Sequence, residues 1–180
     1  LRHRYIAVYF LVQLLSYCAM LEASEIRVNL MVEKVFILAG EASGDVYAAD
    51  LLHTLKKQYP TCEYHGIGGN KLSSAGCKLI LNYSDLATIG FWEAAKKWST
   101  LSQAFKSTIE YIINWQPDMV VLINFPGFNL RVAAAIRQHI PRILFYIPPQ
   151  LWAWGGKRIH TLATNCDEVF YFYDFETAAL

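Results

Sequence analysis

The segment GEASGD, which begins at Gly40, combines two acids and a hydroxyl with two glycines directly after an apolar run. Glu41 or Asp45 could accept a proton or a sugar hydroxyl, and Ser43 could donate a hydrogen bond. The glycines, Gly40 and Gly44, permit a tight turn and let a ligand approach the backbone closely. This loop is therefore the first candidate for a catalytic or binding site.

The helix expected after this loop allows two interpretations of the same residues. If it begins near Gly44 or Asp45, its unpaired N–H groups and positive dipole end face the loop, and a phosphate suits that position. In the simpler alternative, Ser43 or Asp45 only caps the helix. The loop does not read G-x-G-x-x-G, and no acid is suitably placed about twenty residues on to bind a ribose, so it lacks a dinucleotide fingerprint.

Short apolar runs alternate with segments of helical periodicity from Lys34 onward. The predicted strands are residues 34–39, 63–68, 78–81, 119–124, 143–147 and 168–172. The predicted helices are residues 45–58, 71–75, 91–115, 130–139 and 157–165, with a further helix from Asp174. The alternation predicts an α/β fold, a Rossmann-like parallel sheet with helices on both faces.

Ligands of such sheets bind at the carboxyl ends of the strands. The loops that follow predicted strands read GEASGD, GIGG, NFPGFN and PPQLWAW. We therefore expect these loops to meet at one edge of the sheet and to carry the functional residues.

The composition excludes several classes of protein. In 180 residues, 54 % are hydrophobic and 17 % charged, which excludes a disordered chain and favours a buried parallel sheet or membrane contact. There is no basic run and no basic stripe interleaved with aromatic residues, so we expect no nucleic-acid partner. The histidines and the four cysteines lack metal-ligand spacing, so we expect no metal and free thiols in a reducing compartment.

Residues 1–30 differ from the rest, with a basic start and then a mostly apolar stretch. We expect this hydrophobic extension to be upstream translated sequence or the result of a start-site error; a signal-like or interfacial anchor is the alternative. Residues 31–180 are expected to form one Rossmann-like domain.

Blocks of sequence occurring in order carry a family resemblance: FILAGEASGD, HGIGGNKLSSAGC, DLATIGFWEA, PDMVVLINFPGFN and YIPPQLWAWGGKRI. From about Val32 to the last residue, they resemble the N-terminal half of lipid-A-disaccharide synthases. The resemblance implies a GT-B glycosyltransferase with two Rossmann-like domains, acting by inversion and without metal or cofactor. It would transfer 2,3-diacylglucosamine from UDP to the 6-hydroxyl of 2,3-diacylglucosamine 1-phosphate in lipid A biosynthesis.

The resemblance also assigns roles to residues. The catalytic candidates are Glu41, Asp45, Glu93 and Asn124. The substrate-binding candidates are Ser43, Gly44, Gly90, Gly127, Phe128, Asn129 and Trp152.

The sequence departs from the family pattern at several positions. Asn124 stands where the family has Asp, and an amide cannot act as a general base although it can orient a hydroxyl. If that Asp is the family's base, this chain is impaired; if it only positions, Glu41, Asp45 or Glu93 remains available. Ile89 replaces a Met, and PPQLWAW replaces the commoner S-P-S-x-W-A-W, whose tryptophans could equally be structural.

In the family, the helix after DLATIGFWE carries an apolar surface for acyl chains and the membrane. Here it offers Trp92, Trp98 and Leu101 beside Lys96, Lys97 and Lys106, a composition suited to anionic lipid. We expect peripheral binding to the cytoplasmic face of the bacterial inner membrane. The alternative is an ordinary core helix whose lysines face water.

The family needs a second domain that binds the UDP-sugar, and this sequence does not include it. We therefore expect a fragment, a truncated product or one part of a split enzyme, with negligible transfer activity alone. The alternatives are a non-catalytic lipid-binding remnant and another two-domain UDP-sugar enzyme, such as a UDP-N-acetylglucosamine epimerase.

Overall fold

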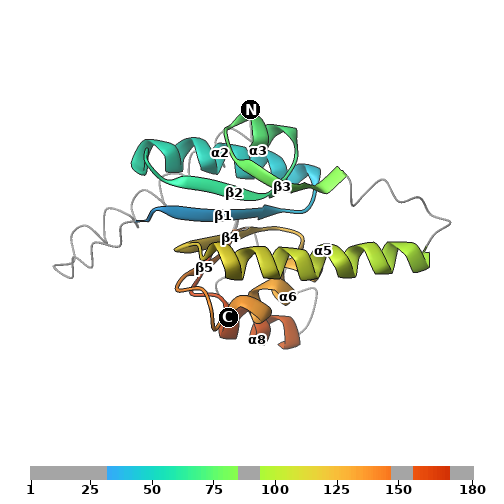
Figure 1. The fold of residues 1–180 in the computed structure, drawn as a ribbon. Coiled ribbons are helices and arrows are strands. Elements are labelled where there is room, and N and C mark those ends of the chain that lie inside the picture. Colours follow the sequence, from blue (N-terminus) through green and yellow to red (C-terminus); the bar gives the residue numbers. More distant parts are fainter. Residues whose placement is uncertain (1–31, 85–93, 147–155, 171–180) are drawn as a thin grey trace, which may run out of the picture. The chain divides into compact units, whose positions relative to one another are not determined.

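The computed structural model describes residues 32–84, 94–146 and 156–170. The chain divides into two units, Leu1–Met31 and Val32–Leu180, and every described residue belongs to the second. These residues form a six-stranded, entirely parallel sheet in the order β3-β2-β1-β4-β5-β6 (Figure 1). The predicted α/β fold is confirmed, and the strand order is that of a Rossmann-like sheet.

The strands lie close to their predicted positions. They are β1 (Lys34–Ala39), β2 (Glu63–Gly68), β3 (Lys78–Asn82), β4 (Met119–Ile123), β5 (Ile143–Tyr146) and β6 (Glu168–Phe170). The described helices are α2 (Ala42–Gln58), α3 (Asn70–Ser74), α5 (Ala94–Trp115), α6 (Pro126–Ile136) and α8 (Gly156–Asn165). The predicted helix from Asp174, the end of the last strand and the start of the long helix lie outside the described residues.

Two helices begin three or four residues earlier than the sequence predicted. The helix α2 begins at Ala42 because Glu41, in extended backbone, serves as its N-cap without a capping side chain. The helix α6 begins at Pro126, not at Leu130, because proline fits the first helical position, where no N–H bond is needed. The helix α2 therefore starts directly after Glu41, and α6 starts two residues after Asn124.

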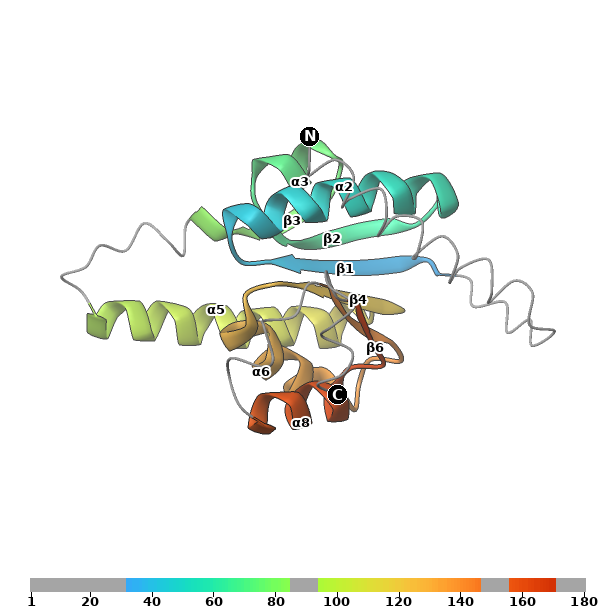
Figure 2. The same cartoon turned by 180° about the vertical axis from the view of Figure 1, so that it is seen from behind.

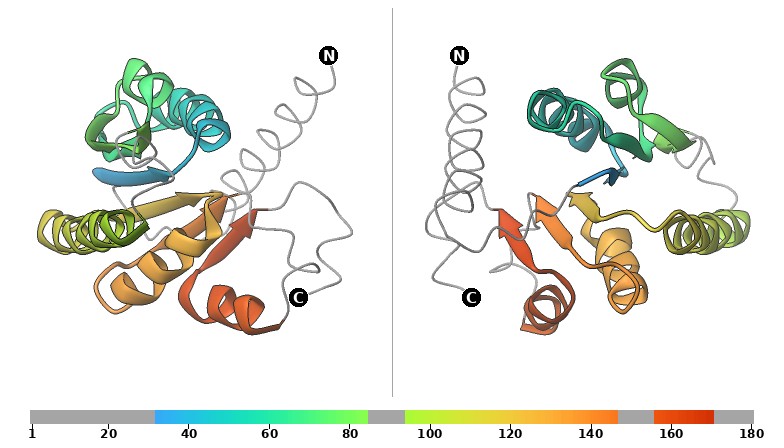
Figure 3. Two further views of the ribbon diagram at one scale, coloured as in Figure 1. Left: turned by 90° about the vertical axis from the view of Figure 1, so that its right-hand side faces the viewer. Right: turned by 60° about the vertical axis from the view of Figure 1, so that its left-hand side comes forward.

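Helices cover both faces of the sheet, as predicted. The helices α2 and α3 lie on one face, and α5, α6 and α8 lie on the other (Figures 2 and 3). Alternate residues of each central strand, such as Phe36 and Leu122, join one buried cluster with Ile112 of α5, Ile136 of α6 and Leu162 of α8. Burial on both faces explains why these strands read as continuous apolar runs.

Two aspartates that directly precede strands bind the starts of neighbouring strands. The Asp118 carboxylate, before β4, accepts hydrogen bonds from the amides of Glu33 (2.8 Å) and Lys34 (2.9 Å) at the start of β1. The Asp167 carboxylate, before β6, accepts one from the Ile143 amide (2.7 Å) at the start of β5. Each carboxylate satisfies backbone donors that the ladder leaves unpaired at the amino edge of the sheet.

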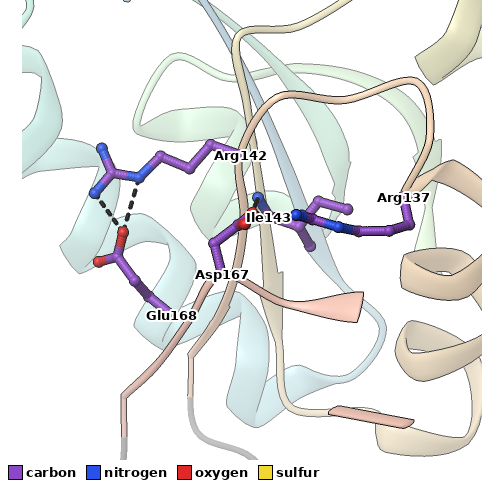
Figure 4. A network of polar contacts seen from close by, with 5 residues as sticks. All are labelled: Arg137, Arg142, Ile143, Asp167 and Glu168. Atoms are coloured by element: carbon purple, nitrogen blue, oxygen red, sulfur yellow. Dashed lines mark hydrogen bonds and ion pairs between the residues drawn. The ribbon is translucent and has the colours of Figure 1, made fainter. Parts of the chain in front are cut away.

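Arginines complete the attachment of the last strand (Figure 4). The Arg137 guanidinium donates to the Asp167 carboxylate at 2.6 Å, and Arg142 donates through two nitrogens to Glu168. Burial opposes ionisation of Asp167, but the hydrogen bonds from Arg137 and from the Ile143 amide hold its pKa below the ordinary value. The start of β6 is therefore fixed by charge-assisted contacts far from the carboxyl edge.

Cys62, Cys77 and Cys166 carry free thiols, as predicted. Within the described ranges, no helix is long and apolar enough to cross a bilayer.

A histidine near the amino end of β2 is buried against aromatic side chains of α5. The His65 ring stacks on Trp115, with 4.1 Å between ring centroids, and its Nδ1 lies 2.7 Å from the Tyr111 hydroxyl. Burial, helped by Lys78 and Lys34 and opposed by Glu63, lowers the pKa of His65 below its ordinary value of 6.5. The folded state therefore favours the neutral ring.

We predict that His65 makes the fold less stable in mild acid. The unfolded chain takes up a proton near pH 6.5 and the folded chain only at lower pH, so stability is complete above that value and falls as pH drops below it. Urea unfolding between pH 7.5 and 5 should show up to about one extra proton bound on unfolding. That part of the slope should disappear in His65→Phe and persist in a variant of the exposed His53, His53→Asn; equal slopes in all three proteins would contradict the prediction.

Candidate functional site

The central strands β1 and β4 are neighbours, and the chain leaves them in opposite directions. The loop after β1 leads to α2 on one face of the sheet, and the loop after β4 leads to α6 on the other (Figure 3). Ala39 pairs with Ile123, so the next residues, Gly40 and Asn124, leave the sheet side by side. Open α/β sheets bind ligands at such a switch point, beyond the carboxyl ends of the strands.

Three of the predicted site residues meet there and form what we call the Glu41 cluster: Glu41, Ser43 and Asn124. Both the Ser43 hydroxyl and the Asn124 side-chain amide donate hydrogen bonds to Oε1 of Glu41. The Asn124 Nδ2 atom also lies 3.5 Å from the Ser43 Oγ atom. Glu41 and Asn124 are half-buried and Ser43 is exposed, so the cluster is open to solvent.

The backbone of the second loop is strained where it carries Asn124. Asn124 and the next residue, Phe125, both have positive φ angles, 49° and 45°. Each left-handed non-glycine residue costs on the order of 1–2 kcal/mol, although Asn tolerates the conformation better than Phe. Such strain persists only where the surrounding structure enforces it, and it concentrates at functional sites.

Packing of Phe125 explains part of this conformation. Its ring lies 5.7 Å from that of Phe128 and directly over Gly40, where an added Cβ would come within 2.3 Å of the ring. Gly40 is therefore required for close approach of the two loops rather than for a turn of its own. Gly44 is also close to this junction, since an added Cβ there would lie 3.4 Å from the Ala39 side chain.

Asp45 has a different environment from Glu41. It is only 3 % exposed, and its carboxylate accepts hydrogen bonds from the amides of Gly69 (2.7 Å), Lys71 (3.1 Å) and Leu72 (3.1 Å). Asp45 therefore caps α3, not its own helix as the simpler alternative from the sequence supposed. This use of both oxygens gives Asp45 a structural task that Glu41 does not have.

The residues of the PGFN segment lie at different depths. Gly127 is exposed, and nothing lies within 4 Å of a Cβ added to it. Phe128 is buried and packs edge-on against Phe105 of α5, with 5.7 Å between centroids. Asn129 is 0 % exposed, and its side chain donates to the carbonyl of Asn124, a member of the Glu41 cluster.

The remaining candidates are less well defined. Leu101, in α5, is half-buried against the core, and Trp98 belongs to the same helix. Gly90, Trp92, Glu93 and Trp152 lie outside the described residues. Among the residues that the structure describes, no group of His, Cys, Asp or Glu side chains could hold a metal ion.

Phe125, which joins the two loops, does not stand out in the sequence. Two local signals were present: asparagine favours left-handed backbone, and the residue before a proline, here Pro126, avoids the right-handed helical region. Neither signal reveals that the ring would rest on Gly40, because that contact joins distant parts of the chain.

Comparisons with known proteins agree on one family. A family model described as lipid-A-disaccharide synthetase matches residues 35–179. A lipid-A-disaccharide synthase of Trichlorobacter lovleyi is 34 % identical over 144 residues, which is 80 % of this chain and 38 % of that protein. Lipid-A-disaccharide synthase 1 of Legionella pneumophila strain Paris is 38 % identical over 79 % of this chain and 38 % of its own length. A homologue of the same description from Coxiella burnetii is 33 % identical, with 80 % and 38 % coverage. The chain thus spans well under half the length of these curated relatives.

We predict that Asp45 is required for stability. In Asp45→Asn, the new amide group would face the part-buried Lys71 amide, and this donor would lose its acceptor, which costs about 1 kcal/mol or more of unfolding free energy. Urea denaturation would measure the loss. The matched control is Asp50→Asn, an exposed position on the same helix, which should leave stability unchanged. Equal stability of the two variants would contradict the capping role.

Proposed function

Because the chain belongs to the lipid-A-disaccharide synthetase family, we propose that it forms the acceptor-side domain of an inverting glycosyltransferase. The enzyme would transfer 2,3-diacylglucosamine from UDP to 2,3-diacylglucosamine 1-phosphate. The UDP-sugar site would belong to a second domain of that enzyme.

The observation that carries this proposal is the hydrogen bonding of Glu41. Among the described residues, its donors are Ser43 and Asn124, and both bind Oε1. The other oxygen, Oε2, is left to accept a proton. Two donors on one oxygen also fix the orientation of the carboxylate, which a positioned base needs.

Glu41 is therefore the proposed general base. As the acceptor's 6-hydroxyl oxygen attacks the anomeric carbon, a C–O bond forms, the hydroxyl proton moves to Oε2, and the bond to UDP breaks. UDP leaves with the electron pair, and the configuration at the anomeric carbon inverts. Asn124 cannot take the proton, but its amide holds the base in place.

The start of α2 supports an anionic substrate. Its first intrahelical hydrogen bond joins the Asp45 amide to the Glu41 carbonyl at 2.9 Å, so the three preceding amides lie ahead of the helical ladder. These N–H groups and the positive end of the helix suit the 1-phosphate of the acceptor.

We further propose that α5 faces lipid and that the enzyme binds peripherally to the cytoplasmic face of the inner membrane. Leu101 and Phe105 lie half-buried along this helix, and Lys106 beside them is exposed. The Arg131 guanidinium also lies over the Phe105 ring, 5.0 Å from its centroid. Apolar side chains beside cations suit an anionic bilayer surface.

A non-catalytic lipid-binding domain is the second candidate. The asparagine at position 124, where the family pattern has aspartate, favours it. In the first proposal, by contrast, the Asn124 amide donates a hydrogen bond to Glu41. An aspartate at this position could donate one only when protonated.

We predict that Glu41→Gln lowers kcat of the full-length enzyme carrying this N-terminal sequence by about 10²–10⁴-fold, because the base is lost while the shape is kept. Turnover would be measured from release of UDP. Asp50→Asn, on the same helix but away from the Glu41 cluster, should retain activity.

The same assay on Asn124→Asp separates the two possible bases. With Glu41 as the base, a second carboxylate at position 124 gives no large rise in turnover. A large rise in Asn124→Asp, or full activity in Glu41→Gln, would refute Glu41 as the base. Inactivity of the unaltered enzyme would favour the lipid-binding domain.

We also predict that reversing one charge on α5 weakens membrane binding. Lys106→Glu should lower sedimentation of the chain with vesicles of phosphatidylglycerol and phosphatidylcholine by about fivefold, since each lysine near an anionic surface contributes. Lys57→Glu, an equally exposed position on the opposite face of the sheet, is the control. Equal loss in both variants, or binding no stronger than to vesicles of phosphatidylcholine alone, would contradict the assignment of α5.

A further inference from the structure

Asn129 makes contacts that its buried position alone does not explain. It lies in the first turn of α6 and is 0 % exposed. Its side-chain Nδ2 atom donates to the carbonyl oxygens of Ile123 (3.2 Å) and Asn124 (2.7 Å). The side chain thus folds back from the helix onto the end of β4 and the loop that carries the Glu41 cluster.

The two carbonyl groups need these donors because the sheet ends at this point. The last residue pairs of β4 are Ile123 with Ala39 and Ile123 with Tyr146, and the Asn124 amide makes one more bond, to the Tyr146 carbonyl at 3.1 Å. Beyond them the chain turns into its left-handed segment and leaves the ladder. Both hydrogens of one amide group are used to hold the two carbonyls of this turn.

The other end of the Asn129 side chain supports the same interpretation. Its Oδ1 atom is buried and has no hydrogen-bond partner in the described part of the structure. Buried acceptors without a partner are uncommon in native proteins, so this one needs an explanation. The position requires two uncharged donors on a short side chain, and asparagine supplies them together with an oxygen that the site does not use.

We propose that Asn129 is a positioning residue that, through the backbone of Asn124, aims the Asn124 amide at the Glu41 carboxylate. Holding both carbonyls keeps the turn left-handed, and this backbone directs the Asn124 side chain toward α2. Asn129 itself touches neither substrate. The catalytic use of the contact between Asn124 and Glu41 rests on the proposed function. The contact itself does not, since it lies entirely within this chain.

The test uses the full 180-residue chain, labelled for NMR. In the unaltered chain, we expect nuclear Overhauser contacts between the Asn124 side-chain amide and the Glu41 methylenes, and backbone shifts typical of positive φ at Asn124 and Phe125. In Asn129→Ala, both signatures should disappear. The side-chain amide of Asn124 should then exchange with water about tenfold faster, as expected for the loss of its hydrogen bond to Glu41. Asn129→Ser, which keeps one donor, should be intermediate.

The control is Thr108→Val, which removes a buried hydrogen bond of 2.6 Å within α5, away from the Glu41 cluster. It should lower stability and leave the Asn124 signals unchanged. If Asn129→Ala behaves like Thr108→Val, Asn129 is a packing residue and the proposal is wrong. If Asn129→Ala does not fold, unchanged Asn124 signals in Asn129→Ser refute the proposal and weakened ones support it. Loss of the contact in Asn129→Ala, together with inactivity of the unaltered full-length enzyme, would count against the proposed function and not against this inference.

Discussion

The structure of the site depends on the pairing of β1 with β4 at the centre of the sheet. These strands end at the same level, and the helices that follow them lie on opposite faces, so the two loops leave the sheet together and then separate. Beyond the strand ends, backbone groups lose the ladder and need other partners. Asn129 supplies donors to one loop, the Phe125 ring packs on Gly40 of the other, and the side chains of both loops meet at Glu41.

The carboxylates of this domain differ in what they accept. Asp45, Asp118 and Asp167 each accept hydrogen bonds from backbone amides at the end of a helix or strand. Glu41 accepts only side-chain donors among the described residues, and it does so at the switch point. Carboxylates that pair with backbone hold the fold together, because their removal leaves backbone donors at the ends of elements without an acceptor. A carboxylate held by side chains on one oxygen can still react.

The sequence predicted the features that depend on local periodicity and failed where distant residues compete. Alternating apolar runs and helices predicted the parallel sheet, and the rule for strand ends brought Glu41, Ser43 and Asn124 together correctly. The start of α2 was wrong because Asp45, a good cap by type, binds the amides of α3 instead. The predicted start of α6 was wrong because Pro126 suits a first helical turn, so PGFN opens the helix instead of forming a loop. Propensity alone cannot identify which of several partners a side chain will bind.

The contact between Glu41 and Asn124 joins residues 83 positions apart in sequence. During synthesis, β1, β2 and β3 are complete long before β4 leaves the ribosome, and β1 is then an open edge of a three-stranded parallel sheet. Such an edge is a template for pairing with other chains until its own partner arrives. The arrival of β4 therefore closes an aggregation-prone edge and assembles the site in the same step, so that a chain stalled before Met119 would have neither protection nor chemistry.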